Sequence, residues 1–355
     1  MLRRLCLLVF CVTVLSARAQ DRENGHRGDP KDALDWFERA NAQMNLRTPG
    51  SAPFHMKVKF HAFPGIELLP PEKSEIITGD GVYEETWMSP NQWRREVTLG
   101  SYHAIETHSD RDRKMQASSD YEPSRVLMLM EALLNPISRR SFSPELHPHR
   151  LHWRIDRPSV QGHSLVRIST SDSISGHLNT GTAYVFLPEG ILLQSNETDV
   201  VTTWGDDAVF VGKVVPRQIS IQAGTVRDLL TADVEVESPE KFDPTAFDLT
   251  GGSAAPGMTL RPLHPYEVRT PELISYPVGG AGEQQSKPDM IARFVIDRHG
   301  AVRELEVIYA RSGNGLGLPD GAGHLMDDTR QFKLSPPEID KSPCELVSRV
   351  LWTGH

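Results

Sequence analysis

Polar and apolar residues alternate one by one along much of this chain, and a period of two is typical of a β-strand with one buried face. The clearest example is the run HMKVKFHA at 55–62. Turns rich in Gly, Pro, Asn or Asp separate most of the runs, which favours an antiparallel meander. Similar runs occur at 81–87, 92–99, 102–107, 151–155, 165–170, 183–187, 190–194, 208–215, 219–221 and 229–236.

Two segments have helical periodicity instead. In 31–44, Ala33, Phe37, Ala40 and Met44 fall on one stripe, and Asp29-Pro30 supplies a cap and a first-turn proline. In 123–135, apolar residues again share one face until Pro136 ends the run. A large sheet with two covering helices predicts the α+β class, with a curved antiparallel half-barrel over residues 29–248.

The composition changes after residue 248. The run TGGSAAPG at 250–257 and the prolines that follow predict a Pro/Gly linker over 249–277. A smaller pattern then begins within 278–355: a strand at 289–296, a DRHG turn, a strand at 302–309, a helix at 322–330 and a strand at 345–352. We therefore predict a β-β-α-β module at the C-terminal end.

The first residues predict export. Arg3 and Arg4 precede an apolar run, and the small residues of SARA at 16–19 are typical of a signal-peptidase site, so we predict a signal peptide over 1–19. After its cleavage we expect no transmembrane segment and a periplasmic or secreted bacterial protein. Of three cysteines only Cys344 would remain. The net charge of −9 argues against a nucleic-acid partner, because phosphate binding depends on basic clusters.

The C-terminal module resembles the TonB C-terminal family, and the resemblance covers about the last 85 residues. Energy-coupling TonB proteins carry an uncleaved membrane anchor and a long Pro-Glu/Pro-Lys spacer, and we expect neither here. The resemblance therefore implies a fold and a partner-binding sheet edge rather than energy coupling. The matching positions are Tyr276-Pro277, Asp297 and Gly300, Ser312-Gly313, Arg330-Gln331-Phe332-Lys333 with Pro336, and 346–350.

The larger region resembles the half-barrel of LolA-like periplasmic lipoprotein carriers. The resemblance rests on the N-terminal helix, the long meander, the aromatic run GVYEETWMSPNQWRREV, the helix within 123–135 and the hairpin YVFLPEGILLQSNETD. In that family a curved sheet and its helices enclose an apolar concavity for acyl chains. The corresponding ligand-binding residues are expected to be Met56, Val58, Phe60, Trp87, Trp93, Val126, Met130 and Leu133.

These patterns predict a non-enzymatic protein of the cell envelope that binds a lipid or acyl chain and, through its C-terminal module, an envelope protein. We find no catalytic motif and expect no cofactor. Two alternatives stay open. One is a scaffold whose sheet is fully packed and binds no ligand. The other is a metal-binding protein that uses His147, His149 and His152, since closely spaced imidazoles are ligands for zinc and copper.

Overall fold

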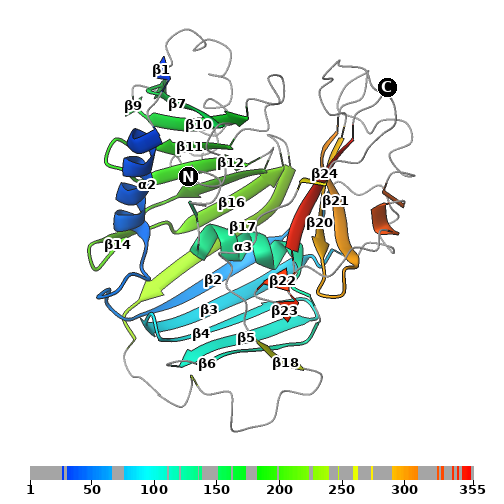
Figure 1. The fold of residues 1–355 in the computed structure, drawn as a ribbon. Helices are drawn as coiled ribbons and strands as arrows, with labels where there is room; N and C mark the ends of the chain where they lie inside the picture. The colour runs from blue at the N-terminus through cyan, green and yellow to red at the C-terminus, as the bar shows by residue number, and fades with distance from the viewer. Residues whose placement is uncertain are drawn as a thin grey trace. The chain divides into compact units, whose positions relative to one another are not determined.

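The structure is a computed structural model in which the described residues form two compact units (Figure 1). Unit 1 is drawn from Met1–Asn45 and Ala132–Asp228, and unit 2 from Leu46–Glu131 and Leu229–His355. The described residues are 26–27, 30–65, 76–109, 112–119, 121–134, 136–137, 151–160, 163–172, 182–197, 200–223, 227–239, 247, 259–262, 273–274, 290–310, 326–327, 329–331, 338–339, 342–343 and 346–352.

Unit 1 is an antiparallel sheet with one helix. Helix α2 (Pro30–Met44) begins at the predicted proline, and its buried stripe includes Ala33, Phe37 and Ala40. The Phe37 ring meets the ring of Tyr184 edge-on, with centroids 5.4 Å apart, so the stripe packs on the sheet as predicted. The strands, in spatial order, are β1 (His26–Arg27), β7 (Leu151–Asp156), β10 (Val166–Asp172), β11 (Thr182–Phe186), β12 (Leu192–Glu197), β13 (Val200–Gly205) and β16 (Gln218–Ala223).

Two small hairpins also belong to unit 1. One joins β8 (Ser159–Val160) to β9 (His163–Ser164). The other joins β14 (Ala208–Phe210) to β15 (Lys213–Val215), where the sequence predicted one strand over 208–215. The prediction of a single strand is wrong because Val211 (φ 45°) and Gly212 (φ 78°) both adopt the left-handed conformation of a two-residue turn.

Unit 2 contains an antiparallel sheet built from strands on both sides of the second segment of unit 1 in the sequence. Its strand order is β17 (Arg227–Glu237), β2 (Phe54–Ala62), β3 (Gly79–Ser89), β4 (Gln92–Leu99), β5 (Tyr102–Ser109), β6 (Asp112–Ala117) and β18 (Thr259–Pro262). Each pair of neighbouring strands in this order runs antiparallel. Helix α3 (Ser124–Leu134) follows β6 in the chain and occupies the predicted helical segment.

A second sheet of unit 2 lies in the C-terminal region. Its order is β19 (Leu273–Ile274), β24 (Leu346–Trp352), β20 (Met290–Ile296) and β21 (Val302–Ala310), and β22 (Glu338–Ile339) pairs with β23 (Ser342–Pro343). The predicted strands of the module are confirmed, whereas the predicted helix at 322–330 lies largely outside the described residues. Strands β18 and β19 fall within 249–277, the predicted linker, and pair there with β6 and β24.

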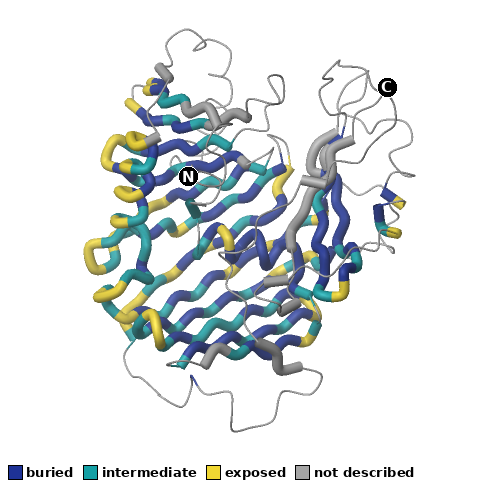
Figure 2. The backbone as a smooth tube through the Cα atoms, viewed as in Figure 1, coloured by how far each residue is buried: buried dark blue, intermediate teal, exposed yellow. Residues whose placement is uncertain are grey.

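The α+β class is thus confirmed, because the described residues form mainly antiparallel β-sheet together with two helices. Figure 2 shows buried residues alternating mainly with intermediate ones along much of β2 to β5, in agreement with the alternation of apolar and polar residues from which these strands were predicted. In the part of the chain that is described, neither helix combines the length and apolar character needed to cross a membrane. The predicted signal peptide lies outside the described residues. The predicted domain boundaries stay a prediction.

Candidate functional site

The candidate site is the inner face of the unit 2 sheet, where side chains from β2 to β5 line up in rows across the strands. Every second residue of β2 and β3 is buried, so one face of each strand points inward. The strand register then sets one buried residue of each strand beside one of the next. Phe54, Trp87, Trp93 and His108 form an aromatic row, Met56, Glu85, Arg95 and Glu106 an ionic row, and Val58, Tyr83, Val97 and Ala104 a mainly apolar row.

Five of the predicted ligand-binding residues lie together on this inner face. Met56, Val58 and Phe60 belong to β2, Trp87 to β3 and Trp93 to β4, and all five are buried. These five side chains therefore share one buried face of the sheet. Whether the surface binds a ligand stays a prediction.

The other three predicted residues belong to α3. Val126 and Met130 are buried, as their helical spacing predicts. Leu133 is half-buried and falls in the range assigned to unit 1. Their role in ligand binding also stays a prediction.

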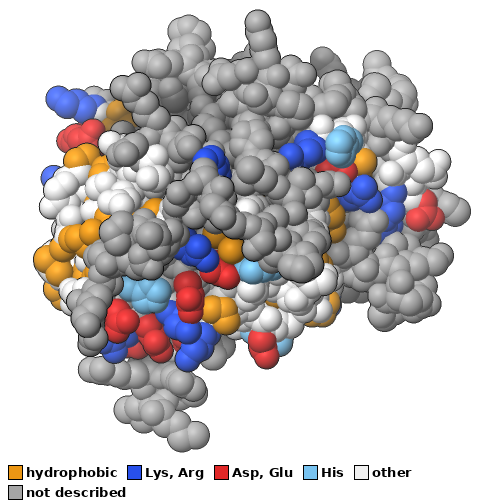
Figure 3. Space-filling model, turned by 90° about the horizontal axis from the view of Figure 1, so that it is seen from below, with side chains coloured by type: hydrophobic (Ala, Val, Ile, Leu, Met, Phe, Trp, Pro, Cys, Tyr) orange, Lys and Arg blue, Asp and Glu red, His pale blue; other side chains and the backbone are white. Residues whose placement is uncertain are grey.

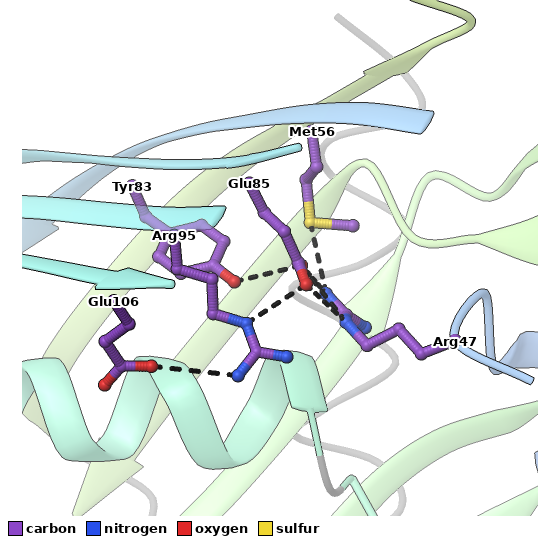
Figure 4. A network of polar contacts seen from close by, with 6 residues as sticks. All are labelled: Arg47, Met56, Tyr83, Glu85, Arg95 and Glu106. Atoms are coloured by element: carbon purple, nitrogen blue, oxygen red, sulfur yellow. Dashed lines mark hydrogen bonds and ion pairs between the residues drawn. The ribbon is translucent and has the colours of Figure 1, made fainter. Parts of the chain in front are cut away.

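The ionic row crosses the apolar face and was not predicted. Glu85 is fully buried, and its Oε1 accepts a hydrogen bond of 3.0 Å from Arg95 Nε and another of 3.0 Å from Arg47 Nε (Figure 4). Arg47 Nη2 is ion-paired with the same carboxylate. Arg95 Nη1 also lies 3.8 Å from Glu106 Oε2, so two guanidinium groups and two carboxylates alternate along the row.

The electrostatics of the row keep Glu85 in its charged form. Burial by itself would raise the pKa of Glu85, but the charges and hydrogen bonds of Arg47 and Arg95 outweigh it and lower the pKa to about 2. Tyr83 donates a hydrogen bond of 3.0 Å to Glu85 Oε2, and burial together with the negative charge of Glu85 raises the pKa of its hydroxyl. Glu85 is therefore an acceptor of fixed hydrogen bonds at neutral pH and unsuited to act as a general base.

The aromatic row covers the charged groups from one side. The rings of Phe54 and Trp87 are stacked with centroids 5.6 Å apart, and the guanidinium of Arg47 lies 5.5 Å from the Phe54 centroid. Arg95 lies 4.1 Å from the centroid of Trp93. Such cation–π contacts compensate part of the hydration that the two arginines lose on burial.

The inner face is closely packed at one position. A Cβ atom built on Gly81 of β3 would lie 2.2 Å from Cζ of Phe60, so the Phe60 ring rests directly on the glycine backbone. The two residues are partners in the β2–β3 register. Part of the predicted concavity is thus filled by the side chain of Phe60 itself.

The outer face of the same strands is charged. Lys57 Nζ lies 2.7 Å from Glu84 Oε1, and Glu96 pairs with both Arg94 and His103, at 2.6 and 2.8 Å. Figure 3 shows a face of the molecule on which basic, acidic and histidine side chains gather. The sheet thus has a solvated, charged outer face and a largely apolar inner face, as antiparallel sheets with one covered side commonly do.

Among the described residues there is no group of three His, Cys, Asp or Glu side chains placed to hold a metal ion. The predicted His cluster is not tested by this result. His147 and His149 lie outside the described residues, and His152 lies in β7 with a side chain that is not described. Cys344 also lies outside them.

No protein-family model matches the chain, and no curated protein matches it significantly in sequence. Three solved structures are similar to it. They are a LolA superfamily protein from Nitrosomonas europaea (9% identity, 61% of this chain, 97% of the other, TM-score 0.35), a DUF1329 family protein from Desulfovibrio piger (9%, 63%, 99%, 0.36) and a putative outer membrane lipoprotein-sorting protein domain from Vibrio parahaemolyticus (7%, 62%, 97%, 0.35).

A LolA superfamily protein is thus among the solved structures similar to this chain. The resemblance of the C-terminal module to the TonB family stays a prediction.

Proposed function

We propose that the protein is exported to the periplasm or the extracellular space and binds an apolar ligand, a lipid or acyl chain, on the inner face of the unit 2 sheet. The observation that carries the proposal is the arrangement of that face. The aromatic row and the mainly apolar row lie on either side of the ionic row across β2 to β5, and charges of the ionic row are paired with one another. Such a surface attracts a ligand through burial of apolar area, at about 25 cal/mol per Å².

The protein would bind the ligand without catalysing a reaction on it. The carboxylate of Glu85 is ionised and occupied by two arginines and a tyrosine, so it neither abstracts nor delivers a proton near neutral pH. We therefore infer a binding protein rather than an enzyme.

A brominated fatty acid tests the proposal, because bromine quenches the fluorescence of a tryptophan only on close approach. Trp87 and Trp93 lie on the proposed surface, whereas Trp36 lies on α2 in unit 1. We expect dibromostearic acid to quench the full-length protein. Trp87→Phe and Trp93→Phe should lose part of the quenched signal, and the matched control Trp36→Phe should lose none of it.

Lipid extraction and mass spectrometry of protein purified from its host provide a second measurement. Co-purifying lipid supports the proposal. Absence of both co-purifying lipid and saturable quenching refutes it, as does an equal loss of signal in the Trp36→Phe control.

A scaffold without a ligand is the second candidate function. It is favoured by the contact of Phe60 with Gly81 and by the burial of Trp87 and Met56, which are 2% and 3% exposed. The same fluorescence experiment decides between the two, since a filled sheet shows no saturable quenching.

We also propose that the C-terminal sheet binds an envelope protein along β21. In the described residues β21 is the last strand of its sheet, and a strand edge accepts a partner strand through main-chain hydrogen bonds. A photo-crosslinker at Arg303, whose side chain is 42% exposed, should give a defined adduct in the host envelope. The control position is Lys59, on the outer face of β2. Absence of an adduct, or the same adduct from Lys59, argues against the proposal.

A further inference from the structure

A second group of buried charges joins the first residues of helix α3 to strand β21; Ser124–Glu131 of the helix and all of β21 belong to unit 2. Arg125 and Glu306 are each 0% exposed and form a two-pronged ion pair, Nη1 to Oε1 and Nη2 to Oε2, both 2.8 Å. Arg125 Nε donates a third hydrogen bond, of 3.0 Å, to the carbonyl of Phe63 just after β2. This pair therefore satisfies its own charges and holds the start of α3 against β21.

Glu304 adds a second carboxylate to the same place. It is 1% exposed, and its Oε2 accepts a hydrogen bond from the backbone N–H of Ser124, the first residue of α3. The helix begins after Pro123, so the cap that a side chain just before the helix normally provides comes instead from a distant strand. A carboxylate at this end also interacts favourably with the helix dipole.

The backbone is distorted to place this side chain. Glu304 has a φ of 48°, a conformation that favours glycine, and the β20–β21 register shifts beside it, where Arg293 pairs with Glu306 and Val295 with Arg303. A bulge of this kind redirects a side chain, and a residue held in the left-handed region costs about 1–3 kcal/mol. The strain turns Glu304 toward α3.

A second carboxylate lies close to Glu304. Among the described residues of this group, two buried carboxylates, those of Glu304 and Glu306, lie near one guanidinium, that of Arg125. The pKa of Glu304 is raised to about 7. Burial is the largest cause and the charge of Glu306 adds to it, whereas the hydrogen bonds of Ser124 and the charge of Arg125 oppose it. A proton thus binds here in the neutral range.

Two basic side chains of the described strands pair with other groups. Arg303 on β21 places its Nε 3.1 Å from Asp297 and its guanidinium 5.9 Å from the Tyr121 ring. Arg293 on β20 lies 3.9 Å from Glu131 of α3. Glu122, two residues before Ser124 in the chain, is also buried and is acidic.

We propose that Glu304 acts as a pH-sensitive latch between β21 and the N-terminus of α3. The contact between the two elements is more stable when Glu304 is protonated and less stable when it is ionised. The reason is linkage. If the carboxylate regains its ordinary pKa when α3 and β21 separate, the joined state binds the proton more tightly, and protonation favours joining to the same extent. Joining is therefore strongest below neutral pH and weakens as the pH rises through the pKa of the joined state. This inference is independent of the proposed ligand.

Hydrogen exchange of the full-length protein tests the latch. A pKa of about 7 when joined and 4.5 when separate predicts that the joining equilibrium strengthens about tenfold between pH 8 and pH 6. Protection of amides in 124–134, corrected for the intrinsic pH dependence of exchange, should rise by that factor. In Glu304→Gln, which is neutral at every pH, protection should be equal at pH 6 and pH 8.

The matched control is Glu131→Gln, which removes a half-exposed carboxylate of the same helix and should keep the tenfold change. A wild-type protein with equal protection at the two pH values overturns the proposal, and this result needs no variant to fold. A Glu304→Gln protein that retains the pH dependence overturns it as well.

Discussion

Replacing Glu85 by Gln is the sharpest test of how the inner face is held together. The substitution keeps the size of the side chain but leaves the guanidinium groups of Arg47 and Arg95, whose side chains are 13% and 11% exposed, without their shared carboxylate. Removing one member of a buried ion pair costs about 3–5 kcal/mol, because the remaining charge stays desolvated.

The pKa of Glu85 gives a second route to the magnitude. A fall from 4.5 to about 2 corresponds to about 3 kcal/mol of stability at neutral pH, at about 1.4 kcal/mol per pKa unit. Both routes predict that Glu85→Gln lowers the free energy of unfolding by about 3 kcal/mol. Because the pKa is lowered on folding, this contribution is complete above about pH 4.5 and disappears as the pH falls toward 2.

Urea unfolding at pH 7 and at pH 3, followed by tryptophan fluorescence, measures both effects. The matched control is Tyr83→Phe, which removes one hydrogen bond to Glu85 but leaves both arginines paired, and should cost about 1 kcal/mol. At pH 3 the difference between wild type and Glu85→Gln should be smaller than at pH 7. A cost below about 1 kcal/mol at pH 7, or one that does not change with pH, would refute this account of the ionic row.

Three further substitutions test other parts of the structure by thermal or urea unfolding. Gly81→Ala should destabilise the protein by about 1–3 kcal/mol, because the new Cβ would overlap the Phe60 ring, and Phe60→Leu should recover part of the loss in the double variant; additive losses would contradict the contact. Val211→Asn should raise stability by about 0.5–1 kcal/mol, because asparagine adopts a φ of 45° with less strain than valine. A loss of stability would show that the valine side chain contributes more than its backbone strain costs. Asp297→Asn should cost about 1–2 kcal/mol at neutral pH, because its carboxylate accepts two backbone hydrogen bonds of 2.9 Å and one from Arg303. Burial raises the pKa of Asp297, but these bonds outweigh it and lower the pKa, so the cost should shrink in acid; an unchanged cost would contradict this.

The sequence predicted the elements whose local pattern and tertiary environment agree. Helix α2 begins at Pro30 because its apolar stripe and its cap both point to that residue. Strands β2 to β5 were recognised because each buries one face. The hairpin of β14 and β15 was missed because its turn is Val-Gly, and valine is not a residue from which a left-handed turn is predicted.

The buried charges could be only half predicted. Glu85 lies between Tyr83 and Trp87 at an inward position of β3, so a charged residue on the apolar side was visible in the sequence. Its partners were not, since Arg47 precedes β2 and Arg95 belongs to another strand. On β21 the pattern was misleading, because the face with Glu304 and Glu306 reads as solvent-exposed and is buried beside α3.

The ionic row also determines which pairings of its strands are tolerable. If β3 slipped by two residues against β4, every side chain would keep its face, so hydrophobic burial alone would barely distinguish the wrong alignment from the right one. Glu85 would then stand opposite Trp93 or Val97 instead of Arg95, and a carboxylate would be sequestered from water without its counter-ion. The salt-bridged residues thus make shifted alignments of β3 and β4 unfavourable and favour the native register during folding.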